Sequence, residues 1–330
     1  MAQREREVRW SLPDGEVFVC ACLNVIGAQL GFEDIEKEGL LISNDLPFEL
    51  GSYWSRKLGE FVIEDIADAS VKIVAHGQPK GPQTVRSTEM RHLNDRITYI
   101  RIALALLGSK TEDHIVVRGG YDEEREIRIH GASTQGKALY QYKEAKCIFA
   151  DRQVLLEAIA LAEIIAAVYS SPTKWMRFRR TLNSYCRACV EQNPYERMHM
   201  FVRTLDGVLK TRQGSGAADF ERRAAVLTGT KYRKMLREAY DLRSSTAHLH
   251  ALPPAFRIQK LANQQLLFLE LLTTETLVRI LKDKVLLSAF VSDDSIDVFW
   301  ASTPSWSPKI QTHVVQQNRE ETWLRRIEEM

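Results

Sequence analysis

The sequence predicts an α+β protein, in which a mixed α/β region over residues 1–150 is followed by an all-α helical bundle over residues 151–291. A C-terminal extension over residues 292–330 completes the chain. Short β-branched and apolar runs alternate with helical patterns before residue 150, whereas helical patterns follow one another after it. A chain of 330 residues also exceeds the usual size of one domain, about 100–200 residues.

The N-terminal region contains several strand-like runs around one helical segment. Residues 16–25 (EVFVCACLNV) form a β-branched, apolar run, and residues 61–74 contain two more such runs, FVIEDI and VKIVA. Residues 94–107 place apolar side chains at helical spacing and end before Gly108, a typical helix-ending residue. Residues 115–117 and 127–129 flank a Gly-Gly-Tyr-Asp turn, which predicts a strand pair.

The second half of the chain is predicted to be helical almost throughout. The expected helices span about 152–170, 173–192, 195–212, 218–228, 231–249 and 256–289. Pro172 and Pro194 stand near the starts of two of them, where proline is tolerated. The last helix is long, so we expect it to break near Thr273 and Thr274. Residues 295–301 (SIDVFWA) then predict a strand, and residues 317–330 a charged amphipathic helix.

Composition favours a cytoplasmic protein with no membrane span. The most apolar stretch, residues 155–169, contains Glu157 and Glu163 and is interpreted as a buried helix, since a span needs about 20 predominantly apolar residues. Residues 1–9 are charged and lack the apolar core of a secretory signal.

Five scattered cysteines favour buried, reduced thiols. Cys186 and Cys189 form a single CxxC inside a helical pattern, whereas a zinc site needs four ligands. Cys20 and Cys22 are the only candidates for a second pair, and buried thiols are the preferred interpretation. We therefore expect no metal and no cofactor.

Charge is unevenly distributed along the chain. Residues 171–260 contain 18 Lys and Arg against 7 Asp and Glu, although the net charge of the whole chain is only +2. Such an excess favours an anionic partner for this segment. The alternative is a solvated basic helix surface beside an acidic neighbouring domain.

The most informative segment, residues 240–250, contains an R-x4-H pair formed by Arg243 and His248. Arg125 and His130 have the same spacing within a strand-like pattern, and we interpret that pair as a chance match. Arg243 and His248 lie instead in the second half of a predicted helix. Near a helix end, such side chains also often only bind carbonyl groups or favour the helix dipole.

Three sequence elements together resemble the HEPN superfamily, most closely its ApeA-like branch. They are Arg203-Thr-Leu-Asp206, residues 220–227 (FERRAAVL) and the Tyr240-Asp-Leu-Arg243-Ser244 element. The resemblance covers about 140 residues, and the order and spacing of the elements make it fairly specific. It departs from the family in three places: Leu249 replaces the usual Gly, Ser244 stands where many active members carry Asn, Asp or His, and Asp206 replaces the more usual Glu.

The resemblance implies a metal-independent endoribonuclease that acts as a homodimer. His248 would be the general acid and base, and Arg243 would bind and stabilise the scissile phosphate. Asp206, Ser244 and Tyr240 would support the pair; Asp206 either orients Arg243 or forms a plain ion pair. Attack by a ribose 2′-OH would leave 2′,3′-cyclic phosphate ends and exclude DNA.

Further basic and aromatic side chains are candidates for contact with RNA. The predicted RNA-binding residues are Arg222, Arg223, Arg233 and Arg237, and the wider basic set adds Arg177, Arg179 and Arg180. Aromatic residues between them are candidates for base stacking, although core packing is the more frequent role: Trp175, Phe178 and Tyr232.

Three functional hypotheses follow from the resemblance. The first is a bacterial antiviral-defence or growth-arrest effector, with an N-terminal sensing or regulatory region that answers to a phage-derived trigger or an inhibitory partner. The second is a non-catalytic HEPN scaffold for RNA binding or dimerisation, which the departures at Ser244 and Leu249 keep open. The third is a toxin restrained by a small nucleotidyltransferase antitoxin, a pairing of shorter chains that the long N-terminal region disfavours.

Overall fold

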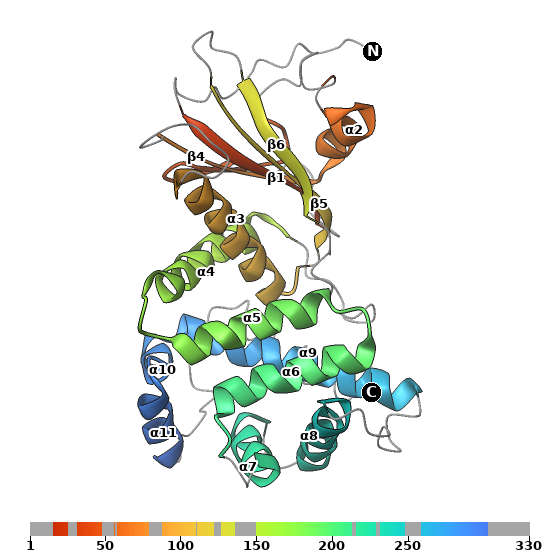
Figure 1. Ribbon diagram of the computed structural model, residues 1–330, viewed down its shortest axis with the longest axis vertical. Coiled ribbons are helices and arrows are strands. Elements are labelled where there is room, and N and C mark those ends of the chain that lie inside the picture. The colour runs from red at the N-terminus through yellow and green to blue at the C-terminus, as the bar shows by residue number, and fades with distance from the viewer. Residues whose placement is uncertain are drawn as a thin grey trace. The chain divides into compact units, whose positions relative to one another are not determined.

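The chain folds into two compact units, and each is described separately. The computed structural model describes residues 16–25, 32–47, 56, 58–78, 88–109, 111–121, 127–135, 150–212, 216–228, 232–247 and 259–302. The sheet unit comprises residues 1–140 and 147–166, and the helical unit comprises residues 141–146 and 167–330. The mixed α+β class predicted from the sequence is confirmed (Figure 1). The division falls within a helix, whereas the predicted boundary lay at residue 150.

The sheet unit contains a six-stranded antiparallel sheet of order β2-β3-β4-β1-β5-β6. The strands are β1 Val17–Val25, β2 Ile35–Glu36, β3 Leu40–Ser43, β4 Val71–Gly77, β5 Thr111–Tyr121 and β6 Ile127–Gln135. The strand predicted at 16–25, the VKIVA strand and the pair across the Gly-Gly turn are thereby confirmed.

Strand β1 lies in the interior of the sheet and is buried along almost its whole length. One face, which includes Phe18, Cys20 and Cys22, packs against helix α2 (Glu60–Asp68) through a cluster that contains Ile66. Helix α3 (Thr88–Leu106) contacts β1 and β4. Covered strands read as continuous apolar runs rather than alternating ones, which explains the sequence of residues 17–25.

The strand predicted at FVIEDI is wrong, because these residues belong to α2. Val62, Ile63 and Ile66 are spaced for one face of a helix, and that face packs on the sheet. Phe61 is exposed instead. The six-residue run was too short for its period to separate a strand from a helix.

Helix α3 confirms the helical pattern of residues 94–107 and begins earlier than predicted, at Thr88. Gly108 follows the helix with φ of 88°. Glycine adopts this left-handed conformation without a steric penalty, so its position as the helix-ending residue is confirmed.

Helix α4 (Arg152–Ser170) has the bounds predicted from the sequence. Of the described helices, it alone is long and apolar enough to cross a membrane by length and composition, with a mean hydropathy of 1.6 over its most apolar 18 residues. In the structure 44% of that stretch is buried, and core helices of soluble proteins pass the same test. The expectation of no membrane span stays a prediction.

In the helical unit, every described secondary-structure element is a helix. The elements are α5 Met176–Val190, α6 Pro194–Leu209, α7 Gly216–Thr228, α8 Arg233–Ala247, α9 Gln259–Lys282, α10 Lys284–Ala289 and α11 Asp293–Ala301. Helix α6 contacts α5, α7, α8 and α9 and is thus the centre of this unit. It begins as predicted, with Pro194 in the first turn and the Asn193 side chain accepting hydrogen bonds from the next backbone N–H groups.

A buried ion pair joins α6 to α9. The Arg197 guanidinium donates to the Glu270 carboxylate at 3.2 Å, and the two side chains are only 7% and 3% exposed. Each of these buried charges compensates the other, and a buried charge without such compensation is strongly destabilising. The pair therefore fixes how these two helices are aligned.

The break predicted near Thr273 is wrong, since α9 continues to Lys282. The Thr273 hydroxyl donates to the carbonyl of Leu269, one turn earlier, so this buried threonine is compatible with the helix. The break comes at Asp283, whose carboxylate accepts hydrogen bonds from two backbone N–H groups and starts α10.

The strand predicted at 295–301 is also wrong, because these residues form helix α11. Ser292 and Ser295 form a reciprocal capping box at its start. Ile296 and Trp300, one turn apart, are buried, and the Trp300 indole N–H donates to the carbonyl of Val208 in α6 at 3.2 Å. Capping and a four-residue apolar spacing outweigh the β-branched character of the segment. The tail predicted as a helix at 317–330 lies outside the described residues.

Candidate functional site

Helix α5 presents a stripe of polar side chains. Arg177, Arg180, Thr181 and Ser184 follow the spacing i, i+3, i+4 and i+7, so they lie on one face of the helix. The apolar side chains of α5 follow a different stripe and are buried in the unit. The sequence of α5 therefore directs its arginines away from the core.

Helix α6 lies against α5 and contributes a second polar stripe, Arg203 and Asp206 with Gly207. A Cβ atom at Gly207 would collide with the hydroxyl of Thr181, so glycine is what allows the two helices to approach here. The Thr181 hydroxyl itself donates to the carbonyl of Arg177 at 3.0 Å. The two arginine-bearing stripes are therefore held close together.

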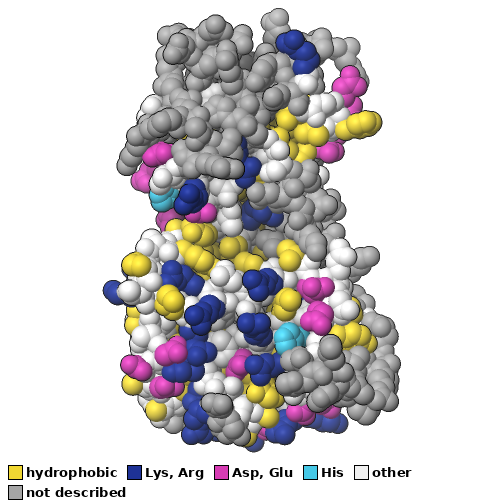
Figure 2. Space-filling model, viewed as in Figure 1, with side chains coloured by type: hydrophobic (Ala, Val, Ile, Leu, Met, Phe, Trp, Pro, Cys, Tyr) yellow, Lys and Arg dark blue, Asp and Glu magenta, His cyan; other side chains and the backbone are white. Residues whose placement is uncertain are grey.

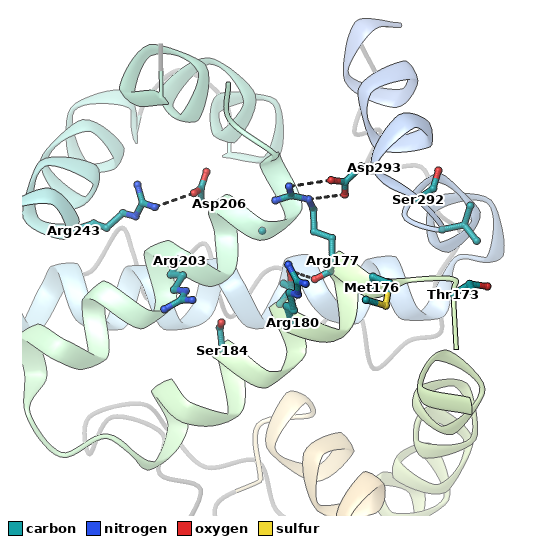
Figure 3. A pocket seen from close by; sticks show the side chains of 13 residues that line it. Thr173, Met176, Arg177, Arg180, Ser184, Arg203, Asp206, Arg243, Ser292 and Asp293 are labelled. Atoms are coloured by element: carbon teal, nitrogen blue, oxygen red, sulfur yellow. Dashed lines mark hydrogen bonds and ion pairs between the residues drawn. The ribbon is translucent and has the colours of Figure 1, made fainter. Parts of the chain in front are cut away.

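These stripes line a pocket of about 460 Å³ in the helical unit (Figure 3). Helix α8 contributes Arg243, and the first residue of α11 is Asp293, which also lines the pocket. The other lining residues are Thr173, Met176, Val291 and Ser292. Four guanidinium groups and two carboxylates thus face one cavity, an arrangement suited to an anionic ligand. Figure 2 shows Lys and Arg side chains gathered over this face of the helical unit.

Arg177 is paired with Asp293 in a two-bond ion pair. Its Nε and Nη2 atoms donate to the two carboxylate oxygens at 2.8 and 3.3 Å. This pairing lowers the pKa of the Asp293 carboxyl and raises the pKa of the Arg177 guanidinium. The side chains of Arg177 and Asp293 are 36% and 53% exposed, so the guanidinium is open to an incoming anion.

Arg243 is paired with Asp206 across α8 and α6. The Nη2 atom of Arg243 lies 3.2 Å from a carboxylate oxygen of Asp206, and the Thr211 hydroxyl donates to the other oxygen. Arg243 keeps 30% of its side chain exposed. Asp206 therefore orients the guanidinium at the pocket wall without enclosing it.

Tyr240 holds Arg243 from a second side. Arg243 donates to the Tyr240 hydroxyl at 3.1 Å and lies 5.3 Å from the centre of the ring. The ring packs on Phe220 in α7, with centroids 5.2 Å apart. A Cβ atom at Gly216 would collide with the Tyr240 hydroxyl, so a glycine is required beside it.

Arg180 and Arg203 differ from the other two arginines of the pocket. Both are exposed, and neither forms an ion pair with any residue that the structure describes. Figure 3 shows them on either side of Ser184. The pocket thus contains two guanidinium groups engaged by carboxylates and two that face solvent.

His199 in α6 also contacts the backbone of α8. Its Nδ1 atom lies 3.3 Å from the carbonyl oxygen of Arg243. A carbonyl oxygen can only accept, so Nδ1 is the donor in this hydrogen bond. This histidine steadies the turn of α8 that carries Arg243, and the sequence analysis did not single it out.

The structure thus brings Arg243, Asp206 and Tyr240 together, as the sequence analysis grouped them. Ser244 is exposed on α8 and does not line the pocket. His248 lies outside the described residues, one position after the end of α8 at Ala247. Arg125, of the second R-x4-H pair, also lies outside them, whereas His130 is in strand β6.

The arginines predicted to bind RNA lie elsewhere. Arg222, Arg233 and Arg237 do not line the pocket, and each is paired with a carboxylate of α7 or α8, at 3.3, 3.8 and 3.5 Å respectively. They remain exposed and charged. Any role in RNA binding would therefore be at the periphery of this site.

Arg223 is buried, and this corrects its prediction as an RNA-binding residue. Its guanidinium donates to the carbonyls of Leu209 and Lys210 at 2.5 and 2.6 Å and lies 5.6 Å from the centre of the Trp300 ring. It therefore satisfies the C-terminal end of α6, where helical carbonyls lack partners. The FERRAAVL pattern does not distinguish the exposed arginine from the buried one, because they are adjacent.

Structural contacts account for Arg179 and for the three aromatic residues of the wider candidate set. Arg179 donates to the carbonyls of Tyr169 and Pro172, at the end of α4. Phe178 and Tyr232 are buried, and the indole of Trp175 donates to a backbone carbonyl, so these aromatic rings are not presented to bases. The burial of Phe178 and Tyr232 supports core packing as the role of these aromatic residues.

The sequence analysis did not select Arg203 or Asp293 as site residues, and it named Arg180 only within the wider basic set. The spacing of Arg177, Arg180 and Ser184 on one helix face was a usable signal for α5. The same face of α6 joins Arg203 to Asp206. Asp293 gave no signal, since it lies in a segment predicted to precede a strand.

The cysteines and acidic residues give no sign of a metal site in the described part of the chain, where no three His, Cys, Asp or Glu side chains gather. Burial raises the pKa of the Cys189 thiol, and a hydrogen bond with Cys22 together with burial raises the pKa of Cys20. Both are therefore neutral thiols. Cys147 lies outside the described residues.

Comparison with known proteins gives no relative: no family model, no curated protein and no solved structure matches the chain. The HEPN resemblance of residues 151–291 therefore stays a prediction.

Proposed function

We propose that the helical unit is a metal-independent endoribonuclease of HEPN type that binds RNA in the arginine-lined pocket. The observation that carries the proposal is the position of Arg243. The sequence singled it out by its motif, and the structure places it in a pocket with three other arginines from different positions in the chain. A guanidinium fork binds two phosphate oxygens at once, so this pocket is suited to a phosphodiester.

The proposed reaction needs one base, one acid and one anion-stabilising group. His248 takes the proton of a ribose 2′-OH, whose oxygen attacks the adjacent phosphorus while the bond to the 5′ oxygen breaks. Arg243 stabilises the negative charge that develops on the phosphoryl oxygens. The leaving 5′ oxygen takes a proton from the imidazolium of a second copy, which is why the proposal includes a homodimer. The products carry a 2′,3′-cyclic phosphate and a 5′-OH.

Asp206 and Tyr240 act in this proposal as positioning residues. Together they restrict the Arg243 guanidinium to one side of the pocket. Five residues along a helix correspond to about 140° of rotation and 7.5 Å of rise, so Arg243 and His248 do not lie directly above one another. Convergence on one phosphate therefore depends on the chain after Ala247 and on the second copy.

A non-catalytic RNA-binding scaffold is the second candidate, and one observation favours it. Arg243 is held by an ion pair, a hydrogen bond and an aromatic ring, which is the environment of a structural arginine as much as of a catalytic one. Both candidates use the same pocket. They differ only in whether bound RNA is cleaved.

Incubation of the purified protein with a 12-nucleotide RNA in EDTA separates the two. The wild type should cleave the RNA and leave 2′,3′-cyclic phosphate ends, detected by mass spectrometry. His248→Ala and Arg243→Lys should lose at least about a hundredfold in rate, since each removes a group that contributes typically 10²–10⁴-fold. His130→Ala is the matched control, because His130 belongs to the other R-x4-H pair.

RNA that stays intact with the wild-type protein, yet binds to it, would establish the scaffold instead. Equal cleavage by the wild type and both site variants would reject the assignment of Arg243 and His248. The wider role that we propose is a bacterial defence or growth-arrest effector, in which the sheet unit responds to a trigger or an inhibitory partner.

A further inference from the structure

Two arginines of the pocket, Arg180 and Arg203, have no part in the proposed reaction. The other two are each engaged by a carboxylate, Arg177 by Asp293 and Arg243 by Asp206. Arg180 and Arg203 are exposed, and neither pairs with an acidic side chain in the described ranges. Neither guanidinium is therefore held at ion-pair distance by a carboxylate of the described residues, although the charge of Arg180 helps to lower the pKa of the Asp293 carboxyl.

The two arginines come from neighbouring helices that are in contact, α5 and α6. Arg180 precedes Thr181 on α5, and Arg203 lies one turn before Gly207 on α6. Thr181 and Gly207 are in direct contact at the point where the two helices are closest. The two guanidinium groups line one pocket, one from α5 and one from α6, so an anion bound there would be attracted by both charges.

Ser184 supplies a neutral donor at the same place. It lies one turn after Arg180 on α5, lines the pocket and is half-buried. The neighbouring Thr181 hydroxyl is occupied by the carbonyl of Arg177, whereas the Ser184 hydroxyl has no hydrogen bond with any described residue. Figure 3 shows it below and between the two arginines.

We infer that Arg180, Arg203 and Ser184 form a second phosphate subsite, which binds the phosphate next to the one held at Arg243. The inference rests on the proposed function and deepens it: the substrate is a single RNA strand with at least two consecutive phosphates. Two guanidinium forks and a hydroxyl fit a tetrahedral phosphate, which offers several oxygens, better than a planar carboxylate with two. The subsite contacts the RNA backbone, so its binding does not depend on the base sequence.

Binding of a fluorescein-labelled 12-nucleotide RNA, measured by fluorescence anisotropy in EDTA, tests the subsite. The double variant Arg180→Ala/Arg203→Ala should bind at least about tenfold more weakly at moderate salt. Its slope of log affinity against log salt should be less steep by about 0.7, the value for one phosphate contact on a single strand. Ser184→Ala should weaken binding by a few-fold without changing the slope.

The matched control is Lys234→Ala/Lys284→Ala, which removes two exposed cations that do not line the pocket. Equal affinity and equal slope for the two double variants would overturn the subsite. Inorganic phosphate is the probe for a free anion. The concentration of phosphate that displaces RNA should differ between the wild type and the Arg180/Arg203 variant. The same displacing concentration for both proteins would also refute the subsite.

Substrate length separates this inference from the proposed function. If the protein cleaves RNA, the wild type should prefer the 12-nucleotide strand over a dinucleotide with one phosphate, and the double variant should lose that preference. If the protein cleaves no RNA but the binding loss and the slope change are found, the enzyme proposal fails and the subsite stands. Cleavage with an unchanged length preference would refute the subsite alone.

Discussion

The Asp293 carboxylate offsets part of the positive charge in the pocket. Replacing Asp293 with asparagine therefore tests directly whether RNA binds in this pocket. Its carboxylate accepts hydrogen bonds from Nε and Nη2 of Arg177, at 2.8 and 3.3 Å, and faces the pocket from the start of α11. Asp293→Asn removes one of the two carboxylates that line the pocket and frees the Arg177 fork. We therefore expect the variant to bind RNA more tightly than the wild type.

The magnitude follows from the exposure of the pair. At a separation of about 6 Å, a carboxylate and a phosphate repel each other by about 0.7 kcal/mol in water and about 2.8 kcal/mol at an effective dielectric constant near 20. Asp293 is 53% exposed, so solvent screening places the effect near the lower value. An increase of roughly threefold to tenfold in affinity corresponds to about 0.7–1.4 kcal/mol.

The assay is anisotropy with the labelled 12-nucleotide RNA over a range of salt concentrations. Asp294→Asn is the matched control, because Asp294 is the next residue, is exposed, sits in the same first helical turn and does not line the pocket. Both variants change the net charge equally and lose the same favourable interaction with the helix dipole. The same affinity for both variants, or a weaker one for Asp293→Asn, would refute the placement of RNA in this pocket.

Three further predictions concern the scaffold of the site. Glu270→Ala should lower the free energy of unfolding in urea by about 3–5 kcal/mol, because it removes the buried carboxylate that accepts a hydrogen bond from the buried Arg197 guanidinium. Arg197→Met/Glu270→Leu should recover most of that loss, and a loss below about 1 kcal/mol for Glu270→Ala would contradict the buried pair. Gly207→Ala should cost about 1–3 kcal/mol by collision with Thr181, and Thr181→Ala should rescue it in a thermal melt; no rescue would place the strain elsewhere. Cys189 should resist iodoacetamide at pH 8, as mapped by mass spectrometry, because burial raises the pKa of its thiol. Since the unfolded thiol ionises near about pH 8.5, the stability that Cys189 contributes should decline as pH rises above that value, and rapid alkylation of native protein would contradict its burial.

Periodicity predicted the long elements of this fold well. Helix α4 has its predicted bounds because nearly every position is apolar between polar ends, and α6 begins at its proline as expected. The break predicted near Thr273 failed, and so did two short segments, residues 61–66 and 295–301, whose β-branched content suggested strands. Both segments are helices because packing, and at α11 also a capping box, decides segments of six to nine residues, and both depend on neighbours in space.

The sequence predicted the site residues that belong to the motif, and it did not predict the others. Arg243, Asp206 and Tyr240 come from motif elements that fold together, and the structure joins them by direct contacts. The pocket also requires Arg180 and Asp293, which no motif marks. Their convergence depends on the close approach of α5 to α6 and on α11 packing against α6, both long-range contacts that a local pattern does not encode.

The most direct test of the account is to locate RNA on the protein. A strand that carries 4-thiouridine, crosslinked by ultraviolet light and mapped by mass spectrometry, should label peptides of α5 (Met176–Val190) and α6 (Pro194–Leu209). The labelling should fall in Arg180→Ala/Arg203→Ala. Crosslinks confined to the sheet unit, or equally strong in that double variant, would contradict the claim that this pocket binds RNA.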